Sequence, residues 1–153
     1  MANEIRTKPI AEATFAITLT ALANNAARQS TLIANGSQYP AALVSVKLTS
    51  HATVAPTAGA VFEVYLLRDV GTLADDAAGA SDAAITLENA PLLGTIVVTA
   101  TAAKAFYGIF DTSPLGPLGA TWGIAIKNAS GQSLHVTEAN HACYYVYYVP
   151  EVQ

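Results

Sequence analysis

Short stretches in which apolar and polar residues alternate recur along the chain. In the range 14–20, Phe15, Ile17 and Leu19 alternate with threonine and alanine, which is the two-residue period of a strand with one buried face. Later stretches rich in β-branched and aromatic residues show the same period or a continuous apolar run. We therefore predict strands over the ranges 14–20, 28–34, 41–49, 61–68, 94–100, 104–110, 121–128 and 142–149, with a short extended segment at 134–137.

The segments between these stretches contain residues that end regular structure. Turns or loops are predicted at Asn35-Gly36, at the proline and glycine of 56–59 and at the run SPLGPLG. The two alanine-rich helix candidates, 21–27 and part of 69–91, are interrupted by Asn, Gly or Asp. The pattern favours an all-β fold: an antiparallel two-sheet sandwich, of jelly-roll type, with about eight strands.

The chain divides into a short arm and one domain. Residues 1–12 are polar, contain Pro9 and show neither helical nor strand periodicity, so we expect an extended N-terminal arm. Residues 13–153 have the length of a single domain with its own core. Within it, the range 69–91 is rich in Ala, Gly and Asp and is too long for a hairpin turn, so we expect an excursion, called here the acidic loop.

Composition draws attention to the surface. Hydrophobic residues make up 52% of the chain and charged residues only 12%, about half of the roughly 25% found in ordinary soluble domains. A surface with few charges has little electrostatic protection against association, so we expect it to meet neighbouring proteins. The alternative explanation is that alanine raises the hydrophobic count without creating adhesive patches.

Charge and targeting signals narrow the possible partners. The net charge is −4 and the basic residues form no run, which argues against direct nucleic-acid binding. No stretch approaches about 18 uninterrupted apolar residues, and the first residues contain no apolar run, so neither a membrane partner nor a signal peptide is expected. The lone Cys143 excludes an internal disulfide, as is typical of a protein made in the cytoplasm.

Candidate metal ligands form no recognisable site. The acidic loop supplies carboxylates, the ligands that calcium requires, but their spacing does not match an EF-hand. His135, His141 and Cys143 lack the grouping of a zinc site. We therefore expect a solvated loop, no metal and no cofactor. The loop carboxylates are Asp69, Asp75, Asp76, Asp82 and Glu88.

Catalytic motifs are equally scarce. No Gly-x-Ser-x-Gly elbow is present for a nucleophilic serine. Glycoside hydrolysis would need a carboxylate pair, for which Glu63, Asp111 and Glu138 are the candidates. A hydrolase would hold two of them in a deep pocket. In the absence of a motif we expect that the protein is not an enzyme and that it takes no small-molecule ligand.

The most distinctive local feature is the run CysTyrTyrValTyrTyrVal near the C-terminus. In a strand, Tyr144 and Tyr148 flank Val146 on one face, while Tyr145 and Tyr147 occupy the other. One tyrosine face in the core is the simpler interpretation. Exposed rings would instead suit a sugar or a protein interface, because tyrosine combines a large contact area with a hydroxyl that can stay hydrated.

The whole-chain pattern resembles small structural proteins of tailed bacteriophages, particularly head decoration or cement proteins. The resemblance rests on the polar arm MANEIRTKPI, on strands such as AALVSVKLTS and GTIVVTA, and on the low charge. It implies a virion subunit that stabilises the shell through many contacts with the major capsid protein or with copies of itself. The expected interface residues are Glu4, Ile5, Arg6, Lys8, Pro9, Tyr144 and Tyr148.

Two neighbouring interpretations stay open. Many repeated contacts with neighbouring subunits would equally suit a tail or head-fibre subunit. A carbohydrate-binding β-sandwich module would instead use Trp122, the tyrosine-rich strand or the acidic loop. A row of exposed rings would favour sugar binding, whereas buried rings would favour assembly.

Overall fold

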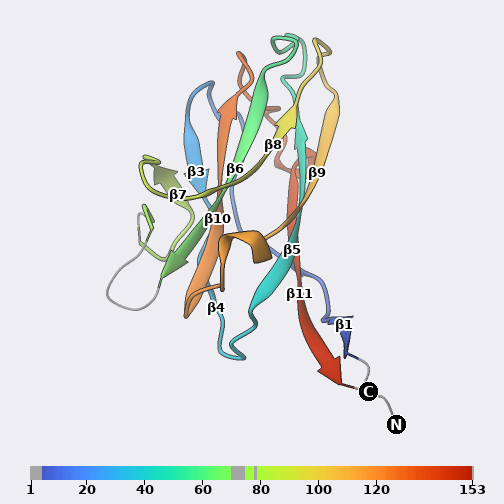
Figure 1. Cartoon of the computed structure of the whole chain (residues 1–153). Helices are drawn as coiled ribbons and strands as arrows, with labels where there is room; N and C mark the ends of the chain where they lie inside the picture. Colours follow the sequence, from blue (N-terminus) through green and yellow to red (C-terminus); the bar gives the residue numbers. More distant parts are fainter. Residues whose placement is uncertain (1–4, 70–74, 78, 153) are drawn as a thin grey trace.

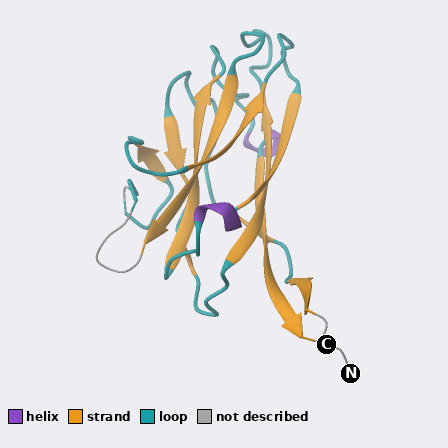
Figure 2. Ribbon diagram, viewed as in Figure 1, coloured by secondary structure: helices purple, strands orange, loops and turns teal. Residues whose placement is uncertain are grey.

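The computed structural model describes residues 5–69, 75–77 and 79–152 (Figure 1). In this part of the chain eleven strands form two antiparallel sheets, which are the two layers of a sandwich (Figure 2). Its helical elements are two short 3-10 turns, η1 (Ser113–Leu115) and η2 (Glu138–Asn140). The prediction of an all-β antiparallel sandwich is confirmed. Among the described residues, no helix has the length and apolar character needed to cross a membrane.

The first sheet has five strands in the order β1-β11-β5-β9, with β2 also beside β11. Its long central strands, β5 and β11, correspond to the predicted ranges 41–49 and 142–149. Both ranges are rich in the β-branched and aromatic residues that pack well on a pleated surface. Its strands are β1 (Ile5–Pro9), β2 (Ala13–Thr14), β5 (Ala41–Thr49), β9 (Ala105–Asp111) and β11 (Ala142–Val152).

The second sheet has six strands in the order β7-β3-β10-β6-β8, with β4 also beside β10. β10 and β6 pair along their whole length, and β8 joins β6 with one register shift. Its strands are β3 (Ala27–Gln29), β4 (Ile33–Ala34), β6 (Val61–Asp69), β7 (Ala83–Ile85), β8 (Leu92–Val97) and β10 (Thr121–Ala129).

The core lies between the sheets and has an aromatic centre. Trp122 of β10 is fully buried and meets Phe15, Tyr145 and Tyr147 edge-on, with ring centroids 5.2–5.7 Å apart. Its indole N–H donates to the Tyr147 hydroxyl at 2.8 Å. Edge-to-face contacts and a paired indole N–H are what a buried aromatic cluster needs. Cys143 is buried in the same core, and this burial raises the pKa of its thiol to about 12.

The strand predicted over 14–20 is wrong, although its buried positions are right. β2 ends at the first residue of that range. Beyond it, the N–H of Phe15 donates to the carbonyl of Cys143 in the first sheet, and the carbonyl of Ala16 accepts from the N–H of Thr31 beside the second. The segment therefore crosses from one sheet to the other. The segment covers one end of the space between the sheets, and every second side chain points into the core. Apolar and polar residues therefore alternate in it as they would in a strand.

Other observed strands also differ from their predicted ranges. The range 28–34 is split into β3 and β4, and the acidic loop contains the short strand β7. The segment 134–137 contributes one isolated bridge, between Leu134 and Ser50. The two alanine-rich candidates form no helix in their described residues.

In the described part of the N-terminal arm, residues 5–9 form β1 and belong to the first sheet. β1 runs antiparallel to the end of β11, from the pair Pro9–Tyr148 to the pair Ile5–Val152. β5 begins opposite Tyr148, and the residues of β11 that follow Tyr148 pair with β1. Figure 1 shows this pair projecting from the body of the sandwich, and we call it the terminal ribbon. The predicted interface residue Glu4 lies outside the described residues.

Candidate functional site

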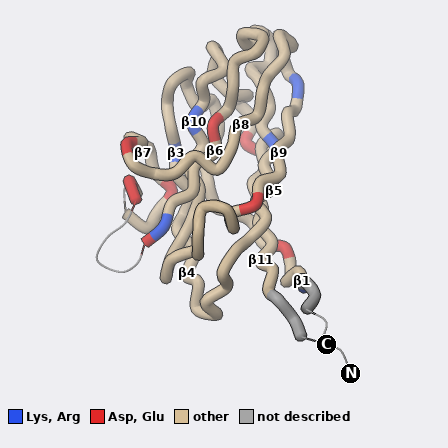
Figure 3. Tube along the Cα trace, in the orientation of Figure 1, with Lys and Arg blue, Asp and Glu red and all other residues tan. Residues whose placement is uncertain are grey.

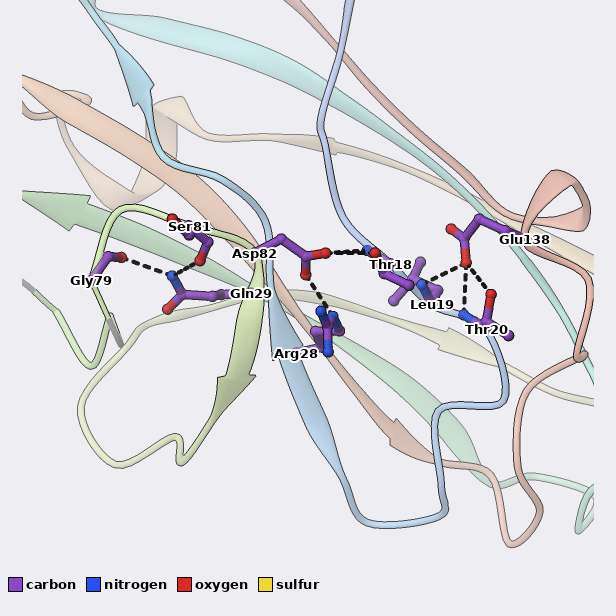
Figure 4. A network of polar contacts seen from close by, with 9 residues as sticks. All are labelled: Thr18, Leu19, Thr20, Arg28, Gln29, Gly79, Ser81, Asp82 and Glu138. Atoms are coloured by element: carbon purple, nitrogen blue, oxygen red, sulfur yellow. Dashed lines mark hydrogen bonds and ion pairs between the residues drawn. The ribbon is translucent and has the colours of Figure 1, made fainter.

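The crossing segment is held by two carboxylates from distant parts of the chain (Figure 4). Asp82 of the acidic loop accepts hydrogen bonds from the N–H of Thr18 at 3.1 Å and from its hydroxyl at 2.6 Å. The same carboxylate pairs with Nε of Arg28 at 2.5 Å. Burial alone would raise the pKa of Asp82, but these partners together lower it. Asp82 is therefore ionised, and its hydrogen bonds and ion pair join the acidic loop to the sandwich.

Glu138 of η2 holds the next residues of that segment. One of its oxygens accepts from the N–H of Leu19 at 2.8 Å, and from the N–H and hydroxyl of Thr20 at 2.7 Å each. Two carboxylates thus satisfy backbone donors that a strand would have paired in a ladder. This explains why a segment with strand periodicity runs outside both sheets.

Two further carboxylates of the acidic loop, those of Asp75 and Asp76, also have partners within the fold. Asp75 forms an ion pair with Arg68 at 3.3 Å. Asp76 accepts from three consecutive backbone N–H groups, those of Glu88, Asn89 and Ala90, and these bonds lower its pKa against the effect of burial. In the described ranges no group of three or more His, Cys, Asp or Glu side chains is arranged to hold a metal ion.

The three candidate hydrolase carboxylates are not brought together in a pocket. Glu63 pairs with Lys127 at 3.0 Å and accepts from the Tyr65 hydroxyl on the second sheet. Asp111 lines a groove of about 420 Å³ on the first sheet, and Glu138 lines a separate pocket of about 220 Å³. Among the residues whose side chains the structure describes, neither of these two hollows is lined by a second carboxylate. The paired arrangement that glycoside hydrolysis requires does not occur in them.

His141 is a buried structural histidine. Its Nδ1 accepts from the N–H of Thr49 at 3.3 Å, and its Nε2 donates to the carbonyl of His135 at 3.0 Å. Burial lowers the pKa of His141, so the neutral ring that makes both bonds is favoured. His141 therefore ties β5 to the segment before β11.

The tyrosine-rich strand divides its rings between the two faces. Tyr145 and Tyr147 lie in the core, 9% and 8% exposed, while Tyr144 and Tyr148 are half-buried on the outside of the first sheet. The burial of Trp122 removes it as a platform for a sugar. The simpler interpretation of this strand, with one tyrosine face in the core, matches the structure.

The outside of the first sheet carries several exposed apolar side chains, which together we call the outer apolar face, although Ser45 and Lys47 of β5 lie among them, opposite Ile109 and Tyr107. Tyr107 and Ile109 of β9 are 69% and 73% exposed, and Leu43 of β5 is 42% exposed. Leu43 is opposite Val146 of β11 in the ladder. The groove of about 420 Å³ adjoins these residues. The outer apolar face consists of Leu43, Tyr107, Ile109, Val146 and Tyr148.

The groove joins this face to the terminal ribbon. It is lined by Pro9 together with Leu43, Val146, Tyr148 and Asp111. The Tyr148 hydroxyl donates to Asp111 at 2.5 Å, and this bond, with those from the next loop, lowers the pKa of the carboxyl against burial. The Asp111 carboxylate at the groove is therefore already hydrogen-bonded.

The predicted interface residues are only partly gathered here. Pro9 and Tyr148 face each other across the β1–β11 pair and line the groove together. Tyr144 lies further along β11, opposite Thr14. Lys8 is opposite Val149 in the terminal ribbon, whose backbone also contains Ile5 and Arg6.

Sequence reasoning missed Tyr107 and Ile109, the most exposed members of the outer apolar face. The signal was available in the run AFYGIFD, where the residues of both faces are apolar. Such a run indicates either a central strand or an edge strand that meets a partner. Because the first sheet is one layer of a two-layer sandwich, one face of β9 is left outside.

Comparison with known proteins supplies no homologue from which a role could be transferred. No protein-family model matches the chain, and no characterised protein matches it either. The outer apolar face and the terminal ribbon are therefore the features from which we infer a function.

Proposed function

We propose that the chain is a structural virion subunit, of the capsid decoration or cement type, that binds neighbouring proteins through the outer apolar face and the terminal ribbon. The observation that carries this proposal is the exposure of Leu43, Tyr107 and Ile109 on one sheet face. Large apolar side chains gathered on one surface are typical of protein interaction sites. The resemblance of the whole sequence to phage decoration proteins indicates which assembly we propose, the shell of a phage head.

The energetics of such a contact suit a repeated assembly. Complete burial of one large apolar side chain is worth about 1.5–3 kcal/mol. Part of that gain is lost to the entropy of association, so one copy of this small face binds modestly. A shell presents many equivalent sites, and symmetric repetition converts modest contacts into strong overall attachment.

The surface charge is compatible with dense packing of copies. Charged residues are sparse and lie scattered along the described trace (Figure 3). Several are already paired, including Arg28 with Asp82 and Lys127 with Glu63. Neighbouring copies therefore experience little mutual repulsion.

Carbohydrate binding is the competing function, and the geometry supports it less. Sugar sites combine a flat exposed ring with adjacent hydrogen-bonding side chains. Trp122, Tyr145 and Tyr147 are buried. Tyr107 is the one exposed aromatic side chain among the described residues, so it forms no row of rings, and its neighbours on the same face are Ile109 and, opposite on β5, Lys47.

Analysis of purified virus particles tests the proposal. Quantitative mass spectrometry should find the protein in particles at a fixed, high copy number, and immunogold electron microscopy should place it on the head. Labelling of tails or fibres would contradict the decoration role. Absence from particles, together with glycan binding by a monomer, would overturn the structural role altogether.

A further inference from the structure

Among the described residues, β9 is the last strand on one side of the first sheet and has β5 as its one ladder partner, so half of its backbone groups point away from that ladder. The N–H of Thr112 donates to the carbonyl of Ala42, and the N–H of Ser50 donates to the carbonyl of Lys104, each at 3.0 Å. These bonds lie at the two ends of the regular β5–β9 ladder. Since bonds in an antiparallel pair recur at every second residue, the even-numbered residues of β9 face β5. The N–H and C=O groups that point to the open edge belong to Ala105, Tyr107, Ile109 and Asp111.

The other described sheet edges carry features that discourage strand addition. β2 and β4 are two residues long and β7 is three residues long. β8 has a register shift opposite Val64 and Tyr65, and β1 contains Pro9. By contrast β9 has seven residues, pairs with β5 without a shift, and contains neither proline nor lysine. Proteins usually protect long regular edges, so an unprotected one points to a partner strand.

The side chains of β9 complement a second copy of the same strand. Antiparallel pairing of two copies around Gly108 places Tyr107 of each opposite Ile109 of the other. Aromatic and β-branched residues form favourable cross-strand pairs, and this pair occurs twice in such a dimer. Gly108 faces its own copy at the axis, where the absence of a side chain permits close approach.

Charge also favours antiparallel pairing with a second copy. Lys104 immediately precedes β9, and Asp111 is its last residue. Antiparallel pairing brings the basic end of each strand beside the acidic end of the other. A parallel arrangement would place like charges together, which is unfavourable.

We propose that β9 pairs with β9 of a second copy of this chain, antiparallel and centred on Gly108, so that two five-stranded sheets form one continuous sheet across a two-fold axis. The inference deepens the proposed function and rests on it for the role of the outer apolar face. It names the partner at β9: another copy of the subunit.

Sedimentation velocity of the full chain over a wide range of concentrations tests this pairing. The wild-type protein should show a monomer–dimer equilibrium. Ile109→Pro should weaken dimerisation about tenfold or more, because it removes an edge N–H and an apolar contact. The melting temperature of the monomer should change little, because that N–H does not face β5. The control Val136→Thr alters a residue that is 57% exposed outside the strands and should leave dimerisation unchanged.

Cross-linking tests the register. The variants Tyr107→Cys and Ile109→Cys, mixed and treated with a short bifunctional thiol reagent, should cross-link to each other faster than either cross-links to itself. Native Cys143 is 2% exposed and should not compete. Preferential cross-linking within a single variant would overturn the register centred on Gly108.

The outcomes separate this inference from the proposed function. A wild-type chain that stays monomeric at every concentration, or a dimer that survives Ile109→Pro, overturns the pairing. If such a chain is nevertheless found in particles, the structural role stands and its β9 partner is another protein. A dimer that depends on Ile109 in a protein absent from particles supports the pairing and removes the virion role.

Discussion

Removal of one hydroxyl group from the core should be measurable in the stability of the whole domain. Tyr147→Phe deletes the acceptor of the Trp122 indole N–H, a bond of 2.8 Å at a tryptophan with 0% exposure. A buried donor left without a partner costs about 1–3 kcal/mol. In a domain of this size each kcal/mol lowers the melting temperature by about 2–4 °C, so a loss of about 2 kcal/mol corresponds to about 4–8 °C.

Tyr145→Phe is the matched control, because the two rings lie on the same strand face with nearly equal exposure. Among the described hydrogen bonds none involves the Tyr145 hydroxyl, so this variant should lose less than about 0.5 kcal/mol. Urea unfolding followed by the fluorescence of Trp122, the chain's one tryptophan, measures both. Equal losses in the two variants would refute the assignment of the energy to the indole hydrogen bond.

Three further outcomes follow from the same structure. Asp82→Asn should destabilise the protein by about 1–2 kcal/mol near neutral pH. Because folding lowers the pKa of Asp82, its contribution is complete above the ordinary carboxyl pKa and is lost as pH falls, so urea titrations should show the variant converging with wild type in acid. Gly119→Ala should cost more than about 2 kcal/mol, because a Cβ would lie 2.3 Å from the carbonyl oxygen of Asp69, whereas Gly36→Ala meets nothing within 4 Å and should be nearly neutral in the same unfolding assay. Thiol reagents should label Cys143 only on unfolding, since burial raises its pKa to about 12, and rapid labelling of the native protein would contradict its position in the core.

Sequence periodicity predicted the fold class well because the long strands are amphipathic or fully buried. The range 41–49 coincides with β5, and 121–128 differs from β10 by one residue. Periodicity failed at 14–20 because it reports which side chains turn inward, not what pairs with the backbone. There the partners are Asp82 and Glu138, which are distant in sequence.

The candidate surface was harder to predict for a related reason. Exposure depends on strand order, and strand order cannot be deduced from alternation alone. The run containing Tyr107 and Ile109 is apolar on both faces, which suits a central strand as well as an edge. The sequence likewise gave no sign that residues 5–9 pair with the end of β11, because that pairing joins the two ends of the chain.

The central claim is that neighbouring proteins cover the outer apolar face when the subunit is assembled. Hydroxyl-radical footprinting tests it most directly, by comparing Tyr107 in purified particles with Tyr107 in the dilute isolated monomer, where the side chain is 69% exposed. We predict a several-fold fall in the labelling of Tyr107 and Ile109 in particles, with labelling of Val136, which is 57% exposed, reduced less. Labelling of Tyr107 that is the same in both states would contradict the account.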